Sequence, residues 1–378
     1  MKFAIITHVP HIIEDNNYFA YAPYVSEMNV WAKYVEKLIV VAPLVQAEKT
    51  PVDTEYQHEN IQFIAIEGFD VLSLNGLFRA VLKIPRISWT IFKAMQNADH
   101  IHLRCPGNVG FLGSIIQIAF RNKLKTAKYA GNWDPQSKQP WTYQLQQWIL
   151  GNTFLTRNMQ VLVYGDWEGS SKNIKPFFTA TYQEIDKLPI SKKEVKGRIA
   201  FVFVGTLVIG KNPLYAIQLV EFLSKKGYDV YLSLYGEGTE RTALEQYVTA
   251  HQIEAVIELH GNQSKDTVQK AYQHSHFVVL PSDSEGWPKA IAEGMFWGCV
   301  PLATPVSCVP FMLDQGKRGI LLAMDLVEDT KQIETLLHAP TDFDTKSKNA
   351  SDWSRNYTLD VFEREIMDLL KPDSKRIK

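Results

Sequence analysis

The sequence predicts an α/β protein built from two doubly wound domains in series, and three observations support this prediction. Apolar, strand-like runs alternate with helical stretches along most of the chain, which favours mainly parallel sheets covered by helices. The 378 residues exceed one ordinary core, because domains usually hold roughly 100–200 residues. A charged stretch at 184–198, which includes Pro189, separates two such alternating series and is typical of a linker.

The first domain is expected to span residues 1–190. Its predicted strands lie at 2–7, 38–42, 61–66, 100–103, 127–130 and 160–163, and its predicted helices at 22–34, 76–97, 109–121 and 141–150. Parallel sheets of this kind bind ligands at the carboxyl ends of their strands. Polar residues that follow these strands are therefore the candidates for function.

The second domain is expected at 199–350. Its predicted strands lie at 200–204, 229–235, 256–260, 277–280 and 300–303, and its predicted helices at 213–226, 240–250, 265–274 and 287–297. Pro213 fits the first position of a helix, where its missing N–H costs little. Residues 351–378 form a C-terminal helix and a basic tail, and the helix is expected to pack back on the first domain.

Composition limits the class of protein. Hydrophobic residues make up 46% of the chain and charged residues 21%, which is typical of a soluble globular protein. Three cysteines without a Cys-x-x-Cys pair argue against a disulfide framework or a zinc site and fit a reducing cytoplasm. The first residues read as a strand instead of a signal peptide, and a bilayer span is not expected, since no run of 18 apolar residues occurs.

The overall charge of −1 hides an asymmetry. Between Val71 and Gly165 the chain has eleven Lys and Arg but only two acids, Asp99 and Asp134, so this segment is net +9. Its part at 71–98 either packs on the sheet with solvated cations or lies as an amphipathic helix on anionic lipid. A nucleic-acid partner is not expected, because no recognised binding motif accompanies the charge.

The first strand-to-helix turn excludes a dinucleotide-dependent dehydrogenase. That class needs Gly-x-Gly-x-x-Gly at this turn, so that the backbone can approach a pyrophosphate. Residues 8–13 read His-Val-Pro-His-Ile-Ile, and the first glycine of the chain is Gly68. A partial match begins at Gly236, after the second strand of the second domain, but tight turns favour glycine in general.

The most specific pattern is the polar cluster after the strand that ends at Leu280. Glu285 lies in the loop, and Glu293 lies between one and two turns into the following helix. Carboxylates accept hydrogen bonds from neighbouring hydroxyls, as a sugar and a ribose present them, and Gly286 exposes backbone N–H groups at the helix start. Alternatively, Glu293 is an ordinary helix acid whose (i, i+4) partner is Lys289.

A second pattern follows the first strand of the second domain. Gly205 comes directly after that strand, and Lys211 precedes the next helix. A lysine at this place can bind a phosphate that approaches the helix start. Taken alone, Lys211 fits a solvated loop lysine equally well.

Together the two patterns resemble the family 4 glycosyltransferases, which have the GT-B fold of two Rossmann-like domains facing a cleft. The Glu-x7-Glu signature of that family after a Pro-Ser strand end is matched by Glu285 and Glu293, and its Gly-Arg-x4-Lys motif by Gly205 and Lys211. The resemblance covers residues 200–322. In the first domain, 21–29 and 128–135 are similar to a bacterial branch of polysaccharide and glycan biosynthesis.

The resemblance implies retaining transfer of a hexose-type sugar from a UDP- or GDP-sugar to a glycan or lipid-linked acceptor, without a metal or a cofactor beyond this co-substrate. It implies that Glu285 contacts the donor sugar and its phosphate region, Glu293 the ribose and Lys211 the diphosphate. Further donor contacts are expected from Gly205, Thr206, Gly236, Gly286 and Trp287. The enzyme is expected in the cytoplasm, including the inner face of the cytoplasmic membrane.

The sequence departs from the family pattern at two places. Thr206 stands where the family has arginine, and Lys289 is expected to supply the missing cation, the alternative being that it only pairs with Glu293. The first-domain histidine of the family is replaced in the stretch Asn132–Asp134. The residues expected on the acceptor side are His8, Arg104, Asn132 and Asp134.

Two other functions are compatible with the same residues. One is a non-hydrolysing sugar-nucleotide epimerase, which would turn over the donor without an acceptor. The other is a non-catalytic subunit that binds a sugar nucleotide. The replacement at Thr206 leaves room for the second, whereas Glu285, Glu293 and Lys211 argue against it.

Overall fold

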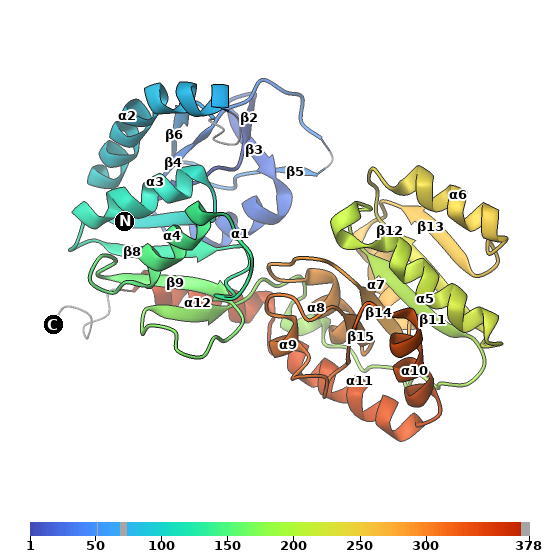
Figure 1. Cartoon of the computed structure of the whole chain (residues 1–378). Coiled ribbons are helices and arrows are strands. Elements are labelled where there is room, and N and C mark those ends of the chain that lie inside the picture. Colours follow the sequence, from blue (N-terminus) through green and yellow to red (C-terminus); the bar gives the residue numbers. More distant parts are fainter. Residues whose placement is uncertain (51, 69–73, 372–378) are drawn as a thin grey trace. The chain divides into compact units, whose positions relative to one another are not determined.

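The chain forms two units, and each is built around one large sheet in which all neighbouring strands run parallel (Figure 1). The computed structural model describes residues 1–50, 52–68 and 74–371. The first unit comprises Met1–Phe177 and Phe362–Lys378, and the second unit comprises Phe178–Val361. The predicted α/β class and the two doubly wound domains are confirmed.

The sheet of the first unit has seven strands in the order β10-β9-β8-β7-β1-β4-β6. From β1 the chain winds outward through β4 and β6, and it then returns to the other side of β1 and winds outward through β7 to β10. The order therefore reverses between β1 and β7, which is the switch point of a doubly wound fold. The strands are β1 Lys2–Ile6, β4 Lys37–Pro43, β6 Ile61–Ile66, β7 His100–Cys105, β8 Leu124–Tyr129, β9 Met159–Tyr164 and β10 Ile174–Phe177.

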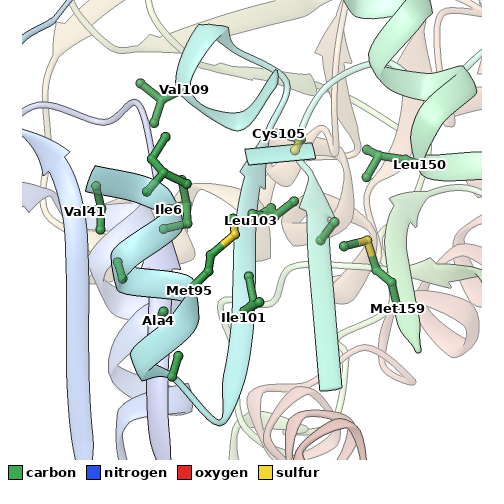
Figure 2. Close-up of a cluster of buried hydrophobic side chains, with 14 of the residues drawn as sticks. Ala4, Ile6, Val41, Met95, Ile101, Leu103, Cys105, Val109, Leu150 and Met159 are labelled. Carbon is green, nitrogen blue, oxygen red and sulfur yellow. The ribbon is translucent and has the colours of Figure 1, made fainter. Parts of the chain in front are cut away.

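The first strand shows why this sheet holds together. Successive side chains of β1 point to opposite faces, and helices cover both faces, so β1 is apolar from Phe3 to Ile6. On one face Phe3 stacks on Trp31 of helix α1 (Ala22–Ala32), with ring centres 5.4 Å apart. On the other face Ile6 lies in a buried cluster with Met95 of helix α2 (Leu74–Asn97), as Figure 2 shows.

Two further helices of this unit, α3 (Asn108–Ile116) and α4 (Trp141–Gly151), follow β7 and β8 (Figure 1). A three-stranded antiparallel sheet, β2-β3-β5, was not predicted from the sequence. It consists of β2 His11–Glu14, β3 Asn17–Tyr21 and β5 Asp53–Glu55. Asp15 and Asn16 form the turn with φ of 50° and 65°, a conformation that Asp and Asn tolerate better than other non-glycine residues.

The sheet of the second unit has six strands in the order β13-β12-β11-β14-β15-β16. This is the 3-2-1-4-5-6 order of a Rossmann-like domain, and its switch point lies between β11 and β14. The strands are β11 Ile199–Val204, β12 Val230–Tyr235, β13 Ile257–Gly261, β14 Phe277–Leu280, β15 Val300–Ala303 and β16 Ile320–Leu321. The helices are α5 Pro213–Lys225, α6 Arg241–His251, α7 Lys265–His274, α8 Lys289–Phe296, α9 Val309–Met312, α10 Leu326–Leu337 and α11 Pro340–Ser354.

The chain passes from one unit to the other earlier than the expected boundary at residue 190. Tyr182 already packs on Phe296 and Trp297 of the second unit, with ring centres 4.7 and 5.4 Å away. The segment 178–190 therefore belongs to the second unit, because its aromatic side chains find their apolar partners there.

The last helix, α12 (Leu359–Leu370), returns to the first unit, as predicted. Phe362 packs on Phe177 with ring centres 5.4 Å apart, and Glu365 forms an ion pair with Lys175. Among the described helices, none combines the length and the apolar composition that crossing a membrane requires.

Candidate functional site

The loops that follow β11 and β14 meet at the switch point of the second unit. The N–H of Asp283 donates to the carbonyl of Gly210 at 2.9 Å. The side-chain amide of Asn212 donates to the carbonyl of Pro281 at 2.9 Å and to the carboxylate of Asp283 at 2.6 Å. Because hydrogen bonds join the loops at several points, groups on one loop have fixed positions relative to groups on the other.

This arrangement brings Lys211 and Glu285 together. The Nζ atom of Lys211 lies 2.5 Å from Oε1 of Glu285. The carboxylate side chain is only 8% exposed, whereas that of Lys211 is 29% exposed. A buried carboxylate needs such a partner, since an unpaired charge is costly away from water. The two residues that the sequence predicts as ligands of the sugar and of the diphosphate are thus direct neighbours.

Glu293 lies on α8 and makes two hydrogen bonds. The hydroxyl of Thr181 donates to Oε1 at 2.7 Å, and the hydroxyl of Tyr272 donates to Oε2 at 3.2 Å. Burial raises the pKa of Glu293 above its ordinary value, although the bond from Thr181, the charge of Lys289 and the bond from Tyr272 act in the opposite direction. Sequence reasoning did not find Thr181 or Tyr272, because neither belongs to a recognisable motif.

Lys289 begins α8, one turn before Glu293. In the described part of the chain, no ion pair within 4.0 Å joins Lys289 to the carboxylate of Glu293. Both residues line a narrow cavity in the second unit, together with Thr181, Tyr182 and Trp287. The charge of Lys289 nevertheless acts on Glu293 and lowers its pKa. Both predictions for Lys289, the replacement of the arginine and the pairing with Glu293, therefore stay predictions.

Aromatic contacts fix the segment at the start of α8. The Trp287 ring stacks on Trp353 at 6.0 Å and meets Tyr357 edge-on at 5.5 Å. The carbonyl of Gly286 accepts a hydrogen bond from Sγ of Cys308 at 3.1 Å. The backbone at Gly286 and Trp287 is thus held in one conformation, which suits a site whose N–H groups must meet a ligand.

Gly205 and Gly236 allow two loops to approach closely. Gly236 has a φ of 142°, and a Cβ atom there would lie 1.9 Å from the carbonyl oxygen of Gly205. The N–H of Gly205 donates to the carbonyl of Tyr235 at 2.9 Å. Thr206 follows at this edge and is exposed. Packing explains the glycine at 236, and its contact with a donor stays a prediction.

In the first unit, His8 and Arg104 lie on the two sides of the switch point between β1 and β7. A Cβ atom on Gly107 would come within 2.7 Å of the His8 ring. Burial, and then the charge of Arg104, lower the pKa of His8. The guanidinium of Arg104 donates to the Glu27 carboxylate at 2.9 Å, so the protein itself already supplies an anion to this predicted acceptor contact.

Asn132 and Asp134 follow β8 and close turns of their own loop. The side-chain oxygen of Asn132 accepts from the N–H of Asp134 at 2.9 Å, and the carboxylate of Asp134 accepts from the N–H of Gln136 at 2.8 Å. Both side chains are half-buried. Their predicted role on the acceptor side stays a prediction, and loop conformation already accounts for them in part.

Residues 184–356 match the protein family described as "Glycosyl transferases group 1". This match covers most of the second unit, including the Lys211 and Glu285 pair. An uncharacterized glycosyltransferase of Methanocaldococcus jannaschii is 27% identical over 171 residues, which are 45% of this chain and 46% of that protein. The chain spans about half the length of the curated relatives it matches.

Solved structures share the fold over nearly the whole chain. The Anabaena protein HepE, crystallised with UDP and glucose, has a TM-score of 0.66 at 14% identity, covering 98% of this chain and 99% of that one. Sucrose-phosphate synthase from Thermosynechococcus elongatus has a TM-score of 0.64 at 15% identity, covering 97% and 98%.

The class of protein follows from these findings. The chain has the GT-B fold, with two Rossmann-like α/β domains. The family match, the relative and the structural neighbours together support a glycosyltransferase. Similarity at this level of identity establishes the fold alone. The donor, the acceptor and the stereochemistry must therefore be inferred from the residues of the site.

Proposed function

We propose that this protein transfers a hexose-type sugar from a nucleotide-sugar donor, a UDP- or GDP-sugar, to a glycan or lipid-linked acceptor with retention of anomeric configuration. The observation that carries the proposal is the contact between Lys211 and Glu285 at the switch point of the second unit. Ligands of doubly wound domains bind at this place. A lysine beside a carboxylate offers one group for a diphosphate and one for sugar hydroxyls.

The proposed chemistry needs few protein groups. As the bond between the anomeric carbon of the sugar and the diphosphate oxygen of the donor breaks, the leaving nucleoside diphosphate gains negative charge. Fixed cations stabilise such charge without reorganising, and this is often the largest contribution that a protein makes. We assign this part to Lys211 and Lys289, and we assign the sugar contact to Glu285. The reaction is proposed to need no metal.

Glu293 is proposed to bind the ribose of the donor. Its carboxylate already accepts two hydroxyl hydrogen bonds, from Thr181 and Tyr272. A ribose diol would present the same kind of donor group, so it would have to replace at least one of these hydroxyls or use a remaining lone pair. The donor contacts of Gly205, Thr206, Gly236, Gly286 and Trp287 belong to the same proposal.

The acceptor side is proposed to lie at the first unit, near the loops after β1, β7 and β8. His8 is the strongest of the predicted residues there, because no ion pair of the described residues includes it. Arg104 is paired with Glu27, so an acceptor would meet this guanidinium while Glu27 holds it in place. We place the reaction in the cytoplasm, at the inner face of the cytoplasmic membrane when the acceptor is lipid-linked.

A donor screen tests the proposal. We expect thermal stabilisation by one family of UDP- or GDP-sugars, followed by slow release of free sugar when the donor is incubated alone with the enzyme. The anomeric configuration of the product, read by NMR, tests retention, and incubation with EDTA tests metal independence. Conversion of the donor into an epimer would support the epimerase instead, and binding without turnover would support a non-catalytic subunit.

A further inference from the structure

Helix α4 exposes a stripe of large apolar side chains in the first unit. Trp141, Leu145 and Trp148 are 71%, 36% and 61% exposed. Their spacing of four and three residues places them on one face of the helix. The opposite face is buried, with Ile149 at 5% and Leu150 at 0%. Contiguous exposed apolar surface of this kind usually marks an interaction site.

A cationic groove lies next to the end of this helix. Arg121, Arg157 and Lys172 line it, together with Phe154, which is 71% exposed. The groove encloses about 550 Å³. The guanidinium of Arg121 lies 4.6 Å from the centre of the Phe154 ring. The residues that line the groove, all of them described by the structure, include no Asp or Glu.

Several other cations of the basic segment 71–165 are used inside the protein. Lys123 donates to the carbonyls of Met95 and Gln96 at 2.9 and 2.7 Å, which lie at the end of α2. Lys125 is buried and donates to the carbonyl of Phe120 at 3.1 Å. Arg104 pairs with Glu27. The three groove cations are exposed, as Arg86, Lys93 and Lys138 are, and within the described chain none of the three groove cations forms an ion pair within 4.0 Å.

We propose that the α4 stripe and the cationic groove together form a docking surface for an anionic lipid bilayer. Tryptophan is suited to the membrane interface, because its ring is apolar and its N–H remains hydrated. Cations near the surface are attracted by anionic headgroups. The groove is the part of the surface that would receive a headgroup phosphate. The inference deepens the proposed function, on which it rests for the nature of the acceptor.

Shape and charge favour a bilayer over a peptide or a basic partner. The stripe lies on a convex helix, whereas a peptide partner would normally be held in an apolar groove. The groove at its end is cationic and lacks acids, so it offers no counterpart to a basic partner. Aromatic side chains beside exposed cations are the composition that binds anionic interfaces.

Co-sedimentation with lipid vesicles tests the inference on the full chain. We expect binding to vesicles of phosphatidylglycerol and phosphatidylcholine in equal parts, weaker binding at high salt, and little binding to pure phosphatidylcholine. The variant W141A/W148A removes the aromatic contacts. The variant R121Q/R157Q/K172Q removes three surface cations, each of which contributes about fivefold to the partition. We expect this triple variant to bind roughly a hundredfold less tightly.

Trp89 on α2 supplies the matched control. It is 61% exposed, as Trp148 is, and Lys93 lies 4.9 Å from its ring centre, so it represents the alternative surface within the same basic segment. We expect W89A to bind like the unmodified protein. Loss of binding in W89A alone, equal binding to neutral vesicles, or full binding by both α4 and groove variants would each overturn the inference.

Two further measurements separate this inference from neighbouring explanations. Donor binding in solution should be unchanged in all these variants, since none of the substituted residues lies in the second unit. A protein that binds anionic vesicles but no sugar nucleotide would leave the docking surface standing and refute the proposed function. If light scattering shows that W141A/W148A only converts a dimer into a monomer while vesicle binding persists, the stripe is a contact between copies and the inference is wrong.

Discussion

The Nζ atom of Lys211 lies 2.5 Å from the Glu285 carboxylate, although 74 residues separate them in the sequence. The two groups follow adjacent parallel strands, β11 and β14, on the two sides of a switch point. The ion pair offsets the cost of burying the carboxylate in the free protein. A donor phosphate that bound beside Lys211 would compete with the Glu285 carboxylate for this cation. The sugar hydroxyls that the proposal places at Glu285 would then have to satisfy the carboxylate in its place.

The roles of these two residues can be separated with UDP and a UDP-sugar as ligands, or with the GDP forms if the screen selects them. Lys211→Ala is expected to weaken both ligands by about 10- to 100-fold, because a charged hydrogen bond is worth roughly 1.5–3 kcal/mol. Glu285→Gln is expected to weaken only the sugar-bearing ligand. Calorimetric titration measures both affinities.

Lys348→Ala serves as the control for this pair of variants. Its side chain is 74% exposed in the same unit, where it pairs with Asp352 on the same helix. We expect its affinities to match those of the unmodified protein. Equal effects of Glu285→Gln on the free nucleotide and on the nucleotide sugar would refute the assignment of Glu285 to the sugar.

Lys289 is predicted to take over the role of the arginine that the family has at the position of Thr206. Lys289→Ala should lower kcat/KM by about 100- to 1,000-fold, the usual cost of losing one group that stabilises transition-state charge. The double variant T206R/K289A should recover part of this loss, because Thr206 is exposed at the edge where the cation is missing. Steady-state kinetics with the identified donor decide, and an unchanged kcat/KM in Lys289→Ala would remove the idea of compensation.

Gly236 is predicted to be required for folding whether or not it touches a donor. Gly236→Ala should destabilise the protein by about 2–4 kcal/mol, since the new Cβ atom would lie 1.9 Å from the Gly205 carbonyl oxygen and φ is 142°. Gly210→Ala is the matched control, as nothing lies within 4 Å of its Cβ position and its effect should stay within about 0.5 kcal/mol. Chemical unfolding measures both, and equal stabilities would contradict the steric argument.

Most elements of the fold could be predicted from the sequence, because their patterns are local. The range of α7, 265–274, matches the prediction, and so do the ranges of β14 and β15. The helix α11 was not among the predicted elements. The stretch around Asp342 is polar, whereas the structure has a helix over Pro340–Ser354 in which Phe343 is buried. Tertiary packing of one aromatic side chain decided that segment, and no local pattern contains this information.

The site was predictable in part for a related reason. Glu285 and Lys211 belong to patterns at strand ends, and parallel strands bring such ends to one edge. Thr181 could not be found in this way. It lies in the segment that enters the second unit, and only the folded structure brings it within 2.7 Å of Glu293. The ion pair between Arg104 and Glu27 could not be predicted either, because residues 77 positions apart form no recognisable sequence pattern.

For Glu293, an effect on donor binding can be separated from an effect on protein stability by measuring both at different pH values. Burial raises the pKa of this carboxyl in the folded protein, so folding favours its neutral form. A raised carboxyl pKa means that ionisation costs stability above the folded pKa, and that this cost disappears as pH falls below the pKa of the unfolded chain. Glu293→Gln imitates the neutral form, and its amide can keep hydrogen bonds to Thr181 and Tyr272.

We therefore expect Glu293→Gln to unfold at the same temperature as the unmodified protein or a higher one at pH 8, with the difference shrinking toward pH 4. Donor affinity should nevertheless fall about tenfold, because a carboxylate accepts hydroxyl hydrogen bonds more strongly than an amide does. Thermal unfolding across this pH range, with and without nucleotide, measures both effects. A variant that is less stable at pH 8, and binds the donor normally once folded, would make Glu293 a structural anchor for Thr181 and not a ligand of the ribose.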